Sequence, residues 1–414
     1  MPAAVEDRPE SCPLSRHCHR PLTRDVYAVL RHHWQLFTET LGCPHTFELH
    51  REHLQRQKRR HNGDGCAAAD AATAGGALAT TAVSDDEVVS YCRASVRPKG
   101  YVYEYLRAAQ LAVVIGDSLF VHGGLTHTRQ LFLPDLSVRY RNLPAGAVPP
   151  GQVLSPADTT VAAWVAGLSA FAAAALDEYD AAPGWNVDRT RRGGGALIAW
   201  QSTPATGGRT PVVQSYLDRG FVVMPPADVA EWLQRQGIFH VLTGHKPVSD
   251  APLVVNLGGF LEIINADLTR SDGEAGDGRG MAVAEVLLQH TEEDGGTLRR
   301  IHGVLRDGRR HDYQTAIPAS ARITATGGAA NDSVGYSARS CVALHVGSVT
   351  DDGYWVKAAL WQEEGGEARE AGDATVTYLI SRVVDRREER RHVTAEELQR
   401  LGVRVSQPSA SPPL

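Results

Sequence analysis

Two histidines stand beside glycine directly after apolar runs, and both are suited to holding a metal ion. The first is His122 in the segment LFVHGGL, and the second is His245 in HVLTGHKP. A neutral imidazole is a common ligand for transition metals such as Mn, Fe and Zn. The adjacent Gly123, Gly124 and Gly244 have no Cβ, so an ion and its bound anion can approach the backbone closely. One such motif alone is typical of a surface histidine, whereas the pair with these flanks is far more specific.

The apolar runs before these histidines predict strands of a buried sheet. Leu111–Ile115 and Ser118–Val121, joined by the polar turn Gly116-Asp117, predict a hairpin, and Ile238–Thr243 leads into the second motif. Side chains just beyond the carboxyl ends of strands leave the core while the sheet holds them, and α/β folds place ligands there. We therefore expect both imidazoles to face a common cation. Two further strands are expected at Leu253–Val255 and Leu261–Ile264.

These segments carry a resemblance to a known family. LFVHGGL, VLTGHKPVSDAPLVV and FLEIINADLTRSD together resemble the C-terminal half of the calcineurin-like metallophosphoesterases, in the Shewanella-like, PPP-type serine/threonine phosphatase branch. The similarity covers about residues 83–288. It implies an α/β fold, a β-sandwich flanked by helices, here with its N-terminal strands missing and a β-rich C-terminal extension added.

The resemblance also implies roles for particular residues. In the family, the two histidines bind one ion of a two-metal centre, which makes His122 and His245 metal ligands here. Asp267 would be a wall of the site rather than a ligand, and Gly123, Gly124 and Gly244 would line it. His127, just past the first motif, could meet a phosphate, although an exposed loop position is the simpler interpretation.

The chain departs from the family in its first part. The motifs GDxHG, GDxxDRG and GNHE, which supply the other ligands and the general-acid histidine, do not occur in it. No catalytic residue is therefore identified, and at most one of the family's two divalent ions (Mn, Fe or Zn type) is expected to bind. Two interpretations remain open: a misplaced start that omits upstream strands, or a degenerate relative of the family.

Two functions follow from this reading. The first is a metal-dependent phosphoesterase, a phosphatase that hydrolyses phosphomonoesters, phosphoproteins included. The second is a catalytically inactive binding or scaffold protein. A phosphorylated substrate is the expected partner in the first case, while the oligomeric state is not predicted.

Composition excludes several other classes of protein. The 414 residues carry a net charge of −6, which does not favour nucleic acid as a partner. No apolar run approaches the roughly 18 residues of a membrane span, and no secretory signal is evident, so we expect an intracellular, cytoplasmic protein. The six scattered cysteines are then expected to be reduced thiols.

The pattern along the chain predicts a disordered lead-in (1–23), a partial phosphoesterase domain (24–325) and a β-rich extension (326–414) that ends in a helix and tail. Within the domain we expect a disordered insertion at 62–82 and loops at about 142–156 and 184–210. Helices are expected at 24–41, 47–60, 84–95, 101–110, 157–179 and 227–236, and a charged run at 385–391 is expected to lead into the final helix. Ser84 and Glu87 predict a capping box at the start of the helix at 84–95, and Thr394 with Glu396 and Glu397 is expected to cap the final helix. Further strands are expected at 281–289, 297–304, 341–346, 354–361 and 374–384.

Overall fold

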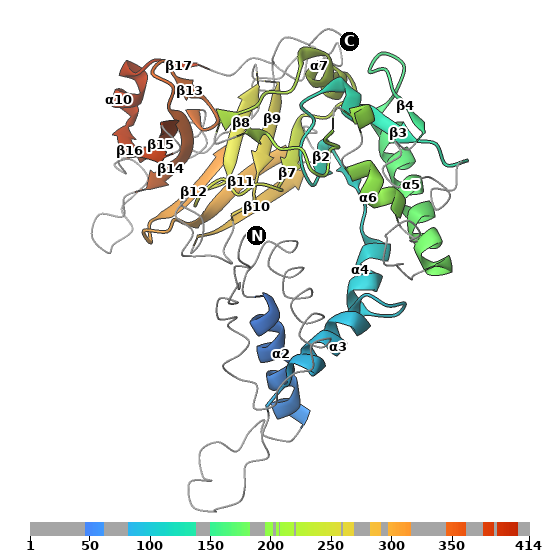
Figure 1. Cartoon of the computed structure of the whole chain (residues 1–414). Coiled ribbons are helices and arrows are strands. Elements are labelled where there is room, and N and C mark those ends of the chain that lie inside the picture. Colours follow the sequence, from blue (N-terminus) through green and yellow to red (C-terminus); the bar gives the residue numbers. More distant parts are fainter. Residues whose placement is uncertain are drawn as a thin grey trace, which may run out of the picture. The chain divides into compact units, whose positions relative to one another are not determined.

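A computed structural model of the chain divides it into two compact units, residues 1–105 and 106–414. Figure 1 shows the ribbon with its helices and strands labelled. The structure describes the following residues: 46–61, 82–137, 150–182, 195–201, 204–206, 208–218, 221–257, 260–268, 282–290, 297–315, 345–361, 376–384 and 387–404.

The first unit contains the helices α2 (Thr46–His61) and α3 (Asp85–Ser95), and α4 (Tyr101–Ala108) begins at its end. All three confirm predicted helices within a few residues. The predicted capping box is present: the Ser84 hydroxyl accepts from the Glu87 N–H at 3.3 Å, and the Ser84 N–H donates to the Glu87 carboxylate at 2.8 Å. Such a box satisfies backbone donors that the first helical turn leaves without partners.

A five-stranded sheet forms the centre of the second unit, in the order β1-β2-β7-β9-β8. Its strands confirm the predicted ones: β1 (Ala112–Ile115), β2 (Ser118–Val121), β7 (His240–Thr243), β8 (Leu253–Leu257) and β9 (Leu261–Asn265). β1 and β2 form the predicted antiparallel hairpin, whereas β2, β7 and β9 run parallel to one another.

Helices cover one face of this sheet. They are α5 (Val161–Ala181), α6 (Gly195–Gln201) and α7 (Ala227–Arg235). Trp164 of α5 meets Trp232 of α7 edge-on, with ring centroids 6.1 Å apart, in a core that includes alternate residues of β8. Among the described helices, α5 is the one that is long and apolar enough, by length and composition only, to cross a membrane. Trp164, Leu168 and Phe171 of α5 are buried in the core of the second unit.

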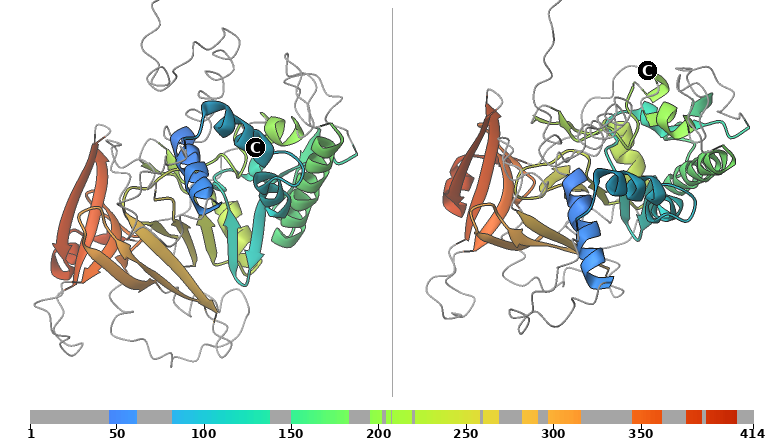
Figure 2. Two further views of the ribbon diagram at one scale, coloured as in Figure 1. Left: turned by 90° about the horizontal axis from the view of Figure 1, so that it is seen from below. Right: turned by 60° about the horizontal axis from the view of Figure 1, so that its bottom comes forward.

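An eight-stranded antiparallel sheet lies against the other face, and the two views of Figure 2 show it opposite α5. Val254 and Ile264 of the first sheet share a core with Ile301 and Val356 of the second. The strands of the second sheet are β10 (Val283–His290), β11 (Thr297–Val304), β12 (Arg310–Thr315), β13 (Val349–Thr350), β14 (Trp355–Trp361), β15 (Val376–Val384), β16 (Arg387–Thr394) and β17 (Val403–Arg404). The helix α10 (Ala395–Arg400) follows β16 and has the expected Thr394 cap.

Several predicted loops contain regular structure. The loop expected at 184–210 includes α6, because Trp200 is buried against Phe171 at a centroid distance of 5.6 Å. The loop expected at 142–156 includes β4 (Gly151–Val153), which pairs with β3 (Phe132–Pro134). The charged run 385–391 belongs largely to strand β16, whose ionic side chains find partners on both faces of the sheet.

Further differences concern the C-terminal half. β12 was not predicted, and His345 and Val346, expected in a strand at 341–346, lie in a turn. Strands on both sides of the expected boundary at residue 325 share the eight-stranded sheet. The expected lead-in (1–23) and the helix at 24–41 lie outside the described residues, as does nearly all of the insertion at 62–82.

Candidate metal site

The parallel strands β2, β7 and β9 end at the same edge of the five-stranded sheet. His122 directly follows β2, Gly244 and His245 follow β7, and Asp267 comes two residues after β9. Since β7 lies between β2 and β9, the residues beyond its end have neighbours on both sides. The topology thus places all three predicted segments together.

His122 and His245 are close enough to share an ion. Their ring centroids lie 5.3 Å apart with an angle of 68° between the ring planes, and the Gly244 N–H donates to the His122 carbonyl at 2.9 Å. An ion bound to imidazole nitrogens at about 2.1 Å holds two ring centroids roughly 4.6–5.3 Å apart, from octahedral to tetrahedral angles. The observed separation lies at the tetrahedral end of this range.

The surroundings of His245 favour its neutral form. Burial lowers its pKa, the nearby His122 and Lys246 lower it further, and Asp267 opposes them. Its ring also hydrogen-bonds the Val213 backbone, which raises the pKa by a smaller amount. The second ring nitrogen of a metal-binding histidine commonly makes such a bond, which fixes the tautomer and the ring orientation.

A segment that the sequence did not single out, Thr210–Tyr216, supports both histidines. It supplies the Val213 backbone to His245, and its Pro211 carbonyl accepts from the Gly123 N–H at 2.8 Å. The buried Tyr216 hydroxyl accepts from the Leu125 N–H at 3.0 Å. The contacts with Gly123 and Leu125 join residues about 90 positions apart in the chain, so only the buried aromatic residue could have hinted at them.

The glycines of the two motifs have different surroundings. A Cβ on Gly123 would lie 2.1 Å from the Gln214 carbonyl oxygen, and one on Gly124 would lie 3.1 Å from the Tyr216 ring. At Gly244 the nearest atom, the His122 carbonyl oxygen, would be 3.6 Å away, an ordinary contact. Gly123 and Gly124 therefore serve the close approach of Thr210–Tyr216, whereas Gly244 is compatible with a small side chain.

Asp267 and His127 have structural partners. The Asp267 N–H donates to the Asn265 side chain at 3.0 Å, and its carbonyl accepts from the Val248 N–H at 3.0 Å. The Asp267 carboxylate acts on His245 electrostatically. His127 caps the short 3-10 helix Thr128–Leu131 by accepting the Arg129 N–H at 3.0 Å on its Nδ1 atom. Its ring is thereby held in place at the end of the first motif.

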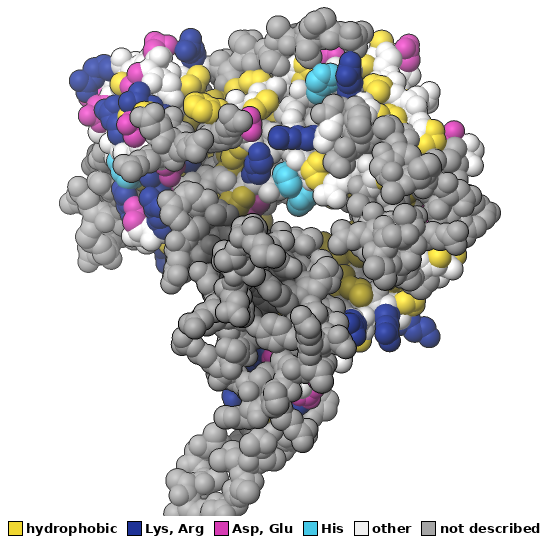
Figure 3. All heavy atoms as spheres, in the orientation of Figure 1, with side chains coloured by type: hydrophobic (Ala, Val, Ile, Leu, Met, Phe, Trp, Pro, Cys, Tyr) yellow, Lys and Arg dark blue, Asp and Glu magenta, His cyan; other side chains and the backbone are white. Residues whose placement is uncertain are grey.

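The two candidate ligands are accessible from the surface, but they do not form a complete metal centre. His122 is exposed and His245 half-buried, and Figure 3 shows histidine side chains next to lysine and arginine side chains on one face of the molecule. Within the described ranges, no group of three His, Cys, Asp or Glu side chains is arranged to hold a metal. The separation of the two imidazoles is compatible with one shared ion, whose remaining positions would be filled by water or by other groups.

Comparisons with known proteins add no assignment. No protein-family model, curated protein or solved structure matches this chain. The resemblance to calcineurin-like metallophosphoesterases thus depends on the motifs quoted above.

Proposed function

We propose that the protein is a metal-dependent phosphoesterase in which His122 and His245 hold a divalent ion. The observation that carries the proposal is the placement of the two rings, 5.3 Å apart beyond the ends of adjacent parallel strands. A phosphomonoester, on a small molecule or a protein, is the proposed substrate. The metallophosphoesterase sandwich is the fold we propose for the two sheets.

The residues present would bind and orient. His122 and His245 would hold the ion as neutral imidazoles, which add no negative charge that would repel a phosphate. A bound divalent ion supplies Lewis acidity and a water of lowered pKa. The Val213 backbone would help to orient the ring of His245, and the Lys246 ammonium donates to the Leu217 carbonyl at 3.0 Å beside the same loop. No residue is assigned to the family's second ion or to its general acid, since the corresponding motifs do not occur.

A binding or scaffold role is the second candidate. It is favoured by the number of ligands, because the described part of the chain brings only two imidazoles together and no third His, Cys, Asp or Glu. Two neutral ligands bind an ion weakly and leave its charge uncompensated. Such a site would hold a phosphate group without hydrolysing it.

Hydrolysis of p-nitrophenyl phosphate by the full chain, with and without Mn²⁺, separates these functions. The phosphoesterase proposal predicts turnover that requires Mn²⁺ and is lost in both His122→Ala and His245→Ala. His302→Ala is the matched control, because His302 of β11 pairs with Glu285 of β10, away from the two candidate ligands. This variant should retain full activity. Mn²⁺ binding without turnover would favour the binding role, and absence of binding would overturn the metal site.

A further inference from the structure

The loop after β7 has an unusual backbone. His245 and Ser249 have φ angles of +74° and +89°, and among the described residues only Lys99 is a further non-glycine residue with positive φ. An L-residue in the left-handed region crowds its Cβ against the following carbonyl, which costs free energy. Residues remain in such conformations where the surroundings determine them, and these conformations cluster at functional sites.

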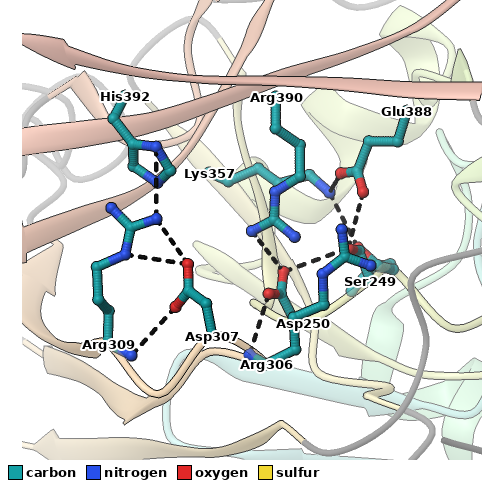
Figure 4. A network of polar contacts seen from close by, with 10 residues as sticks. Ser249, Asp250, Arg306, Asp307, Arg309, Lys357, Glu388, Arg390 and His392 are labelled. Atoms are coloured by element: carbon teal, nitrogen blue, oxygen red, sulfur yellow. Dashed lines mark hydrogen bonds and ion pairs between the residues drawn. The ribbon is translucent and has the colours of Figure 1, made fainter.

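Side chains of the eight-stranded sheet supply these surroundings (Figure 4). The Lys357 ammonium of β14 donates to the Val248 carbonyl at 3.1 Å and to the Glu388 carboxylate at 2.8 Å. The Ser249 hydroxyl donates to the other oxygen of Glu388 at 3.1 Å. One ion pair thus holds two consecutive residues of the loop.

A second ion pair holds the end of the loop. Asp250 is fully buried and accepts from Arg390 of β16 at 2.9 Å and from the Arg306 N–H at 3.2 Å. Burial opposes ionisation of Asp250, but the Arg390 guanidinium keeps the pKa of its carboxyl below the ordinary value. The Glu388 pKa is lowered in the same way, because Lys357 and Arg390 outweigh its burial.

The loop is tied to the five-stranded sheet as well. The Val248 N–H donates to the Asp267 carbonyl at 3.0 Å, and the Asn265 amide donates to the Lys246 carbonyl at 3.2 Å. These bonds reach the loop from β9 and the residues after it. The charged side chains of β14 and β16 reach it from the second sheet, so both sheets contact the same seven residues.

We infer that Lys357, Glu388 and Arg390 are positioning residues, which hold the loop Gly244–Asp250 in the conformation that presents His245 to the metal site. The inference rests on the proposed function of that site. Buried ion pairs add little net stability, because desolvation offsets their attraction, so conformational specificity is a better reason for this cluster. The eight-stranded sheet would then contribute to metal binding without providing a ligand.

Glu388→Gln tests this inference, and Glu389→Gln is its matched control. The two residues are neighbours on β16, but Glu389 pairs with Arg382 at 2.8 Å and with the Tyr354 hydroxyl at 3.1 Å on the exposed face. Hydrogen exchange of the metal-free full chain reports the order of residues 244–250. Mn²⁺ titration reports the affinity of the site for the ion. The part of the binding signal that is lost in His122→Ala is assigned to the site. Thermal unfolding of each variant reports overall stability.

The inference predicts faster exchange at 244–250 and about tenfold weaker Mn²⁺ binding in Glu388→Gln, the usual size for a group that orients a ligand. Glu389→Gln should match the wild type in both. Unchanged affinity and exchange in a folded Glu388→Gln variant would overturn the positioning role and leave the proposed function standing. If the wild type binds no Mn²⁺, the proposed function fails, and exchange alone decides whether the sheet holds the loop. Should Glu388→Gln unfold, Lys357→Met takes its place under the same criteria.

Discussion

Gly123 and Gly244 flank the two candidate ligands, but a methyl group would have opposite consequences at the two positions. In Gly123→Ala the new Cβ meets backbone oxygens of Gln214 and Pro211 that cannot rotate away. We expect this variant to lose about 2 kcal/mol of unfolding free energy, within the range for overpacked sites. Gly244→Ala should stay within about 0.5 kcal/mol of the wild type. Urea denaturation of both variants measures the difference.

Equal losses at Gly123 and Gly244 would contradict this interpretation of the glycines. Such a result would mean that glycine is needed at both positions for its backbone freedom, and not at Gly123 for the close approach of Thr210–Tyr216. The Mn²⁺ titration of Gly123→Ala gives an independent check, because displacement of Pro211 and Gln214 should disturb Val213 and with it the ring of His245.

His311 is a second residue with a distinct consequence, in this case for pH dependence. It is 1% exposed, and neither ring nitrogen has a hydrogen-bond partner among the described residues. Burial lowers its pKa from 6.5 to about 4. The unfolded chain therefore binds the proton more readily than the folded chain. The free energy of unfolding is highest above pH 6.5 and decreases as the pH falls toward 4.

The predicted loss from His311 is about 3 kcal/mol between pH 6.5 and pH 4, at 1.36 kcal/mol for each pKa unit. Unfolding free energies of the wild type and His311→Leu, measured by urea denaturation across this range, test it. The wild type should lose about 3 kcal/mol more than the variant. His302→Leu, at a half-buried position on the neighbouring strand β11, should change the slope far less than His311→Leu, because His302 has only a minor effect on the His311 pKa. Parallel pH profiles for the wild type and His311→Leu would refute the prediction.

At the scale of helices and strands, elements whose interacting groups are neighbours in the sequence could be predicted, whereas elements that depend on distant residues could not. The Ser84–Glu87 capping box predicted the start of α3, and the polar turn between two apolar runs predicted the β1–β2 hairpin, because all the interacting groups lie within a few residues. The charged strand β16 was missed because its side chains find partners on other elements, such as Lys357 on β14. No pattern within residues 385–391 contains that information.

The candidate site shows the same division. His122 and His245 were found through their motifs, and the parallel pairing of β2 and β7 brings them together. The segment Thr210–Tyr216 and Lys357 were not found, because they make contacts with residues far away in the chain: Tyr216 with Leu125, 91 positions away, and Lys357 with Val248, 109 positions away. The candidate ligands could be predicted from local sequence, whereas the residues proposed to position them depend on the tertiary fold.

The helix α6 provides a test at this scale. Its seven residues are too few to form a stable helix on their own, so tertiary packing such as that of Trp200 against Phe171 must stabilise it. Trp200→Ala should lower the unfolding free energy by about 3–5 kcal/mol, as other buried large-to-small substitutions do. Val153→Ala, in a side chain 43% exposed, is the control and should change it by less than about 0.5 kcal/mol. A loss below about 1 kcal/mol in Trp200→Ala would show that α6 is not held by this contact.

At the scale of the second unit, a chain of buried polar side chains connects the two sheets. Asp117 accepts from His240 Nδ1 at 3.1 Å, Arg299 of β11 donates to His240 Nε2, and Arg299 pairs with Glu262 of β9 at 2.5 Å. Since arginine is always protonated, His240 must be the neutral tautomer with its proton on Nδ1. Burial, in addition, lowers the His240 pKa. Glu262 and Arg299 are both almost completely buried, so neither charge can turn to water.

This connection predicts how the two sheets depend on each other. Arg299→Met leaves the Glu262 carboxylate buried without its guanidinium partner, which should cost about 3–5 kcal/mol. Arg299→Met combined with Glu262→Leu removes both charges and should recover at least about 2 kcal/mol of that loss, because well-packed apolar groups replace buried ion pairs at little cost. Urea unfolding followed by tryptophan fluorescence and by circular dichroism should give one coincident transition for the wild type. A double variant as unstable as Arg299→Met would mean that the hydrogen bond to His240, rather than the charge of Glu262, makes Arg299 necessary for joining the sheets.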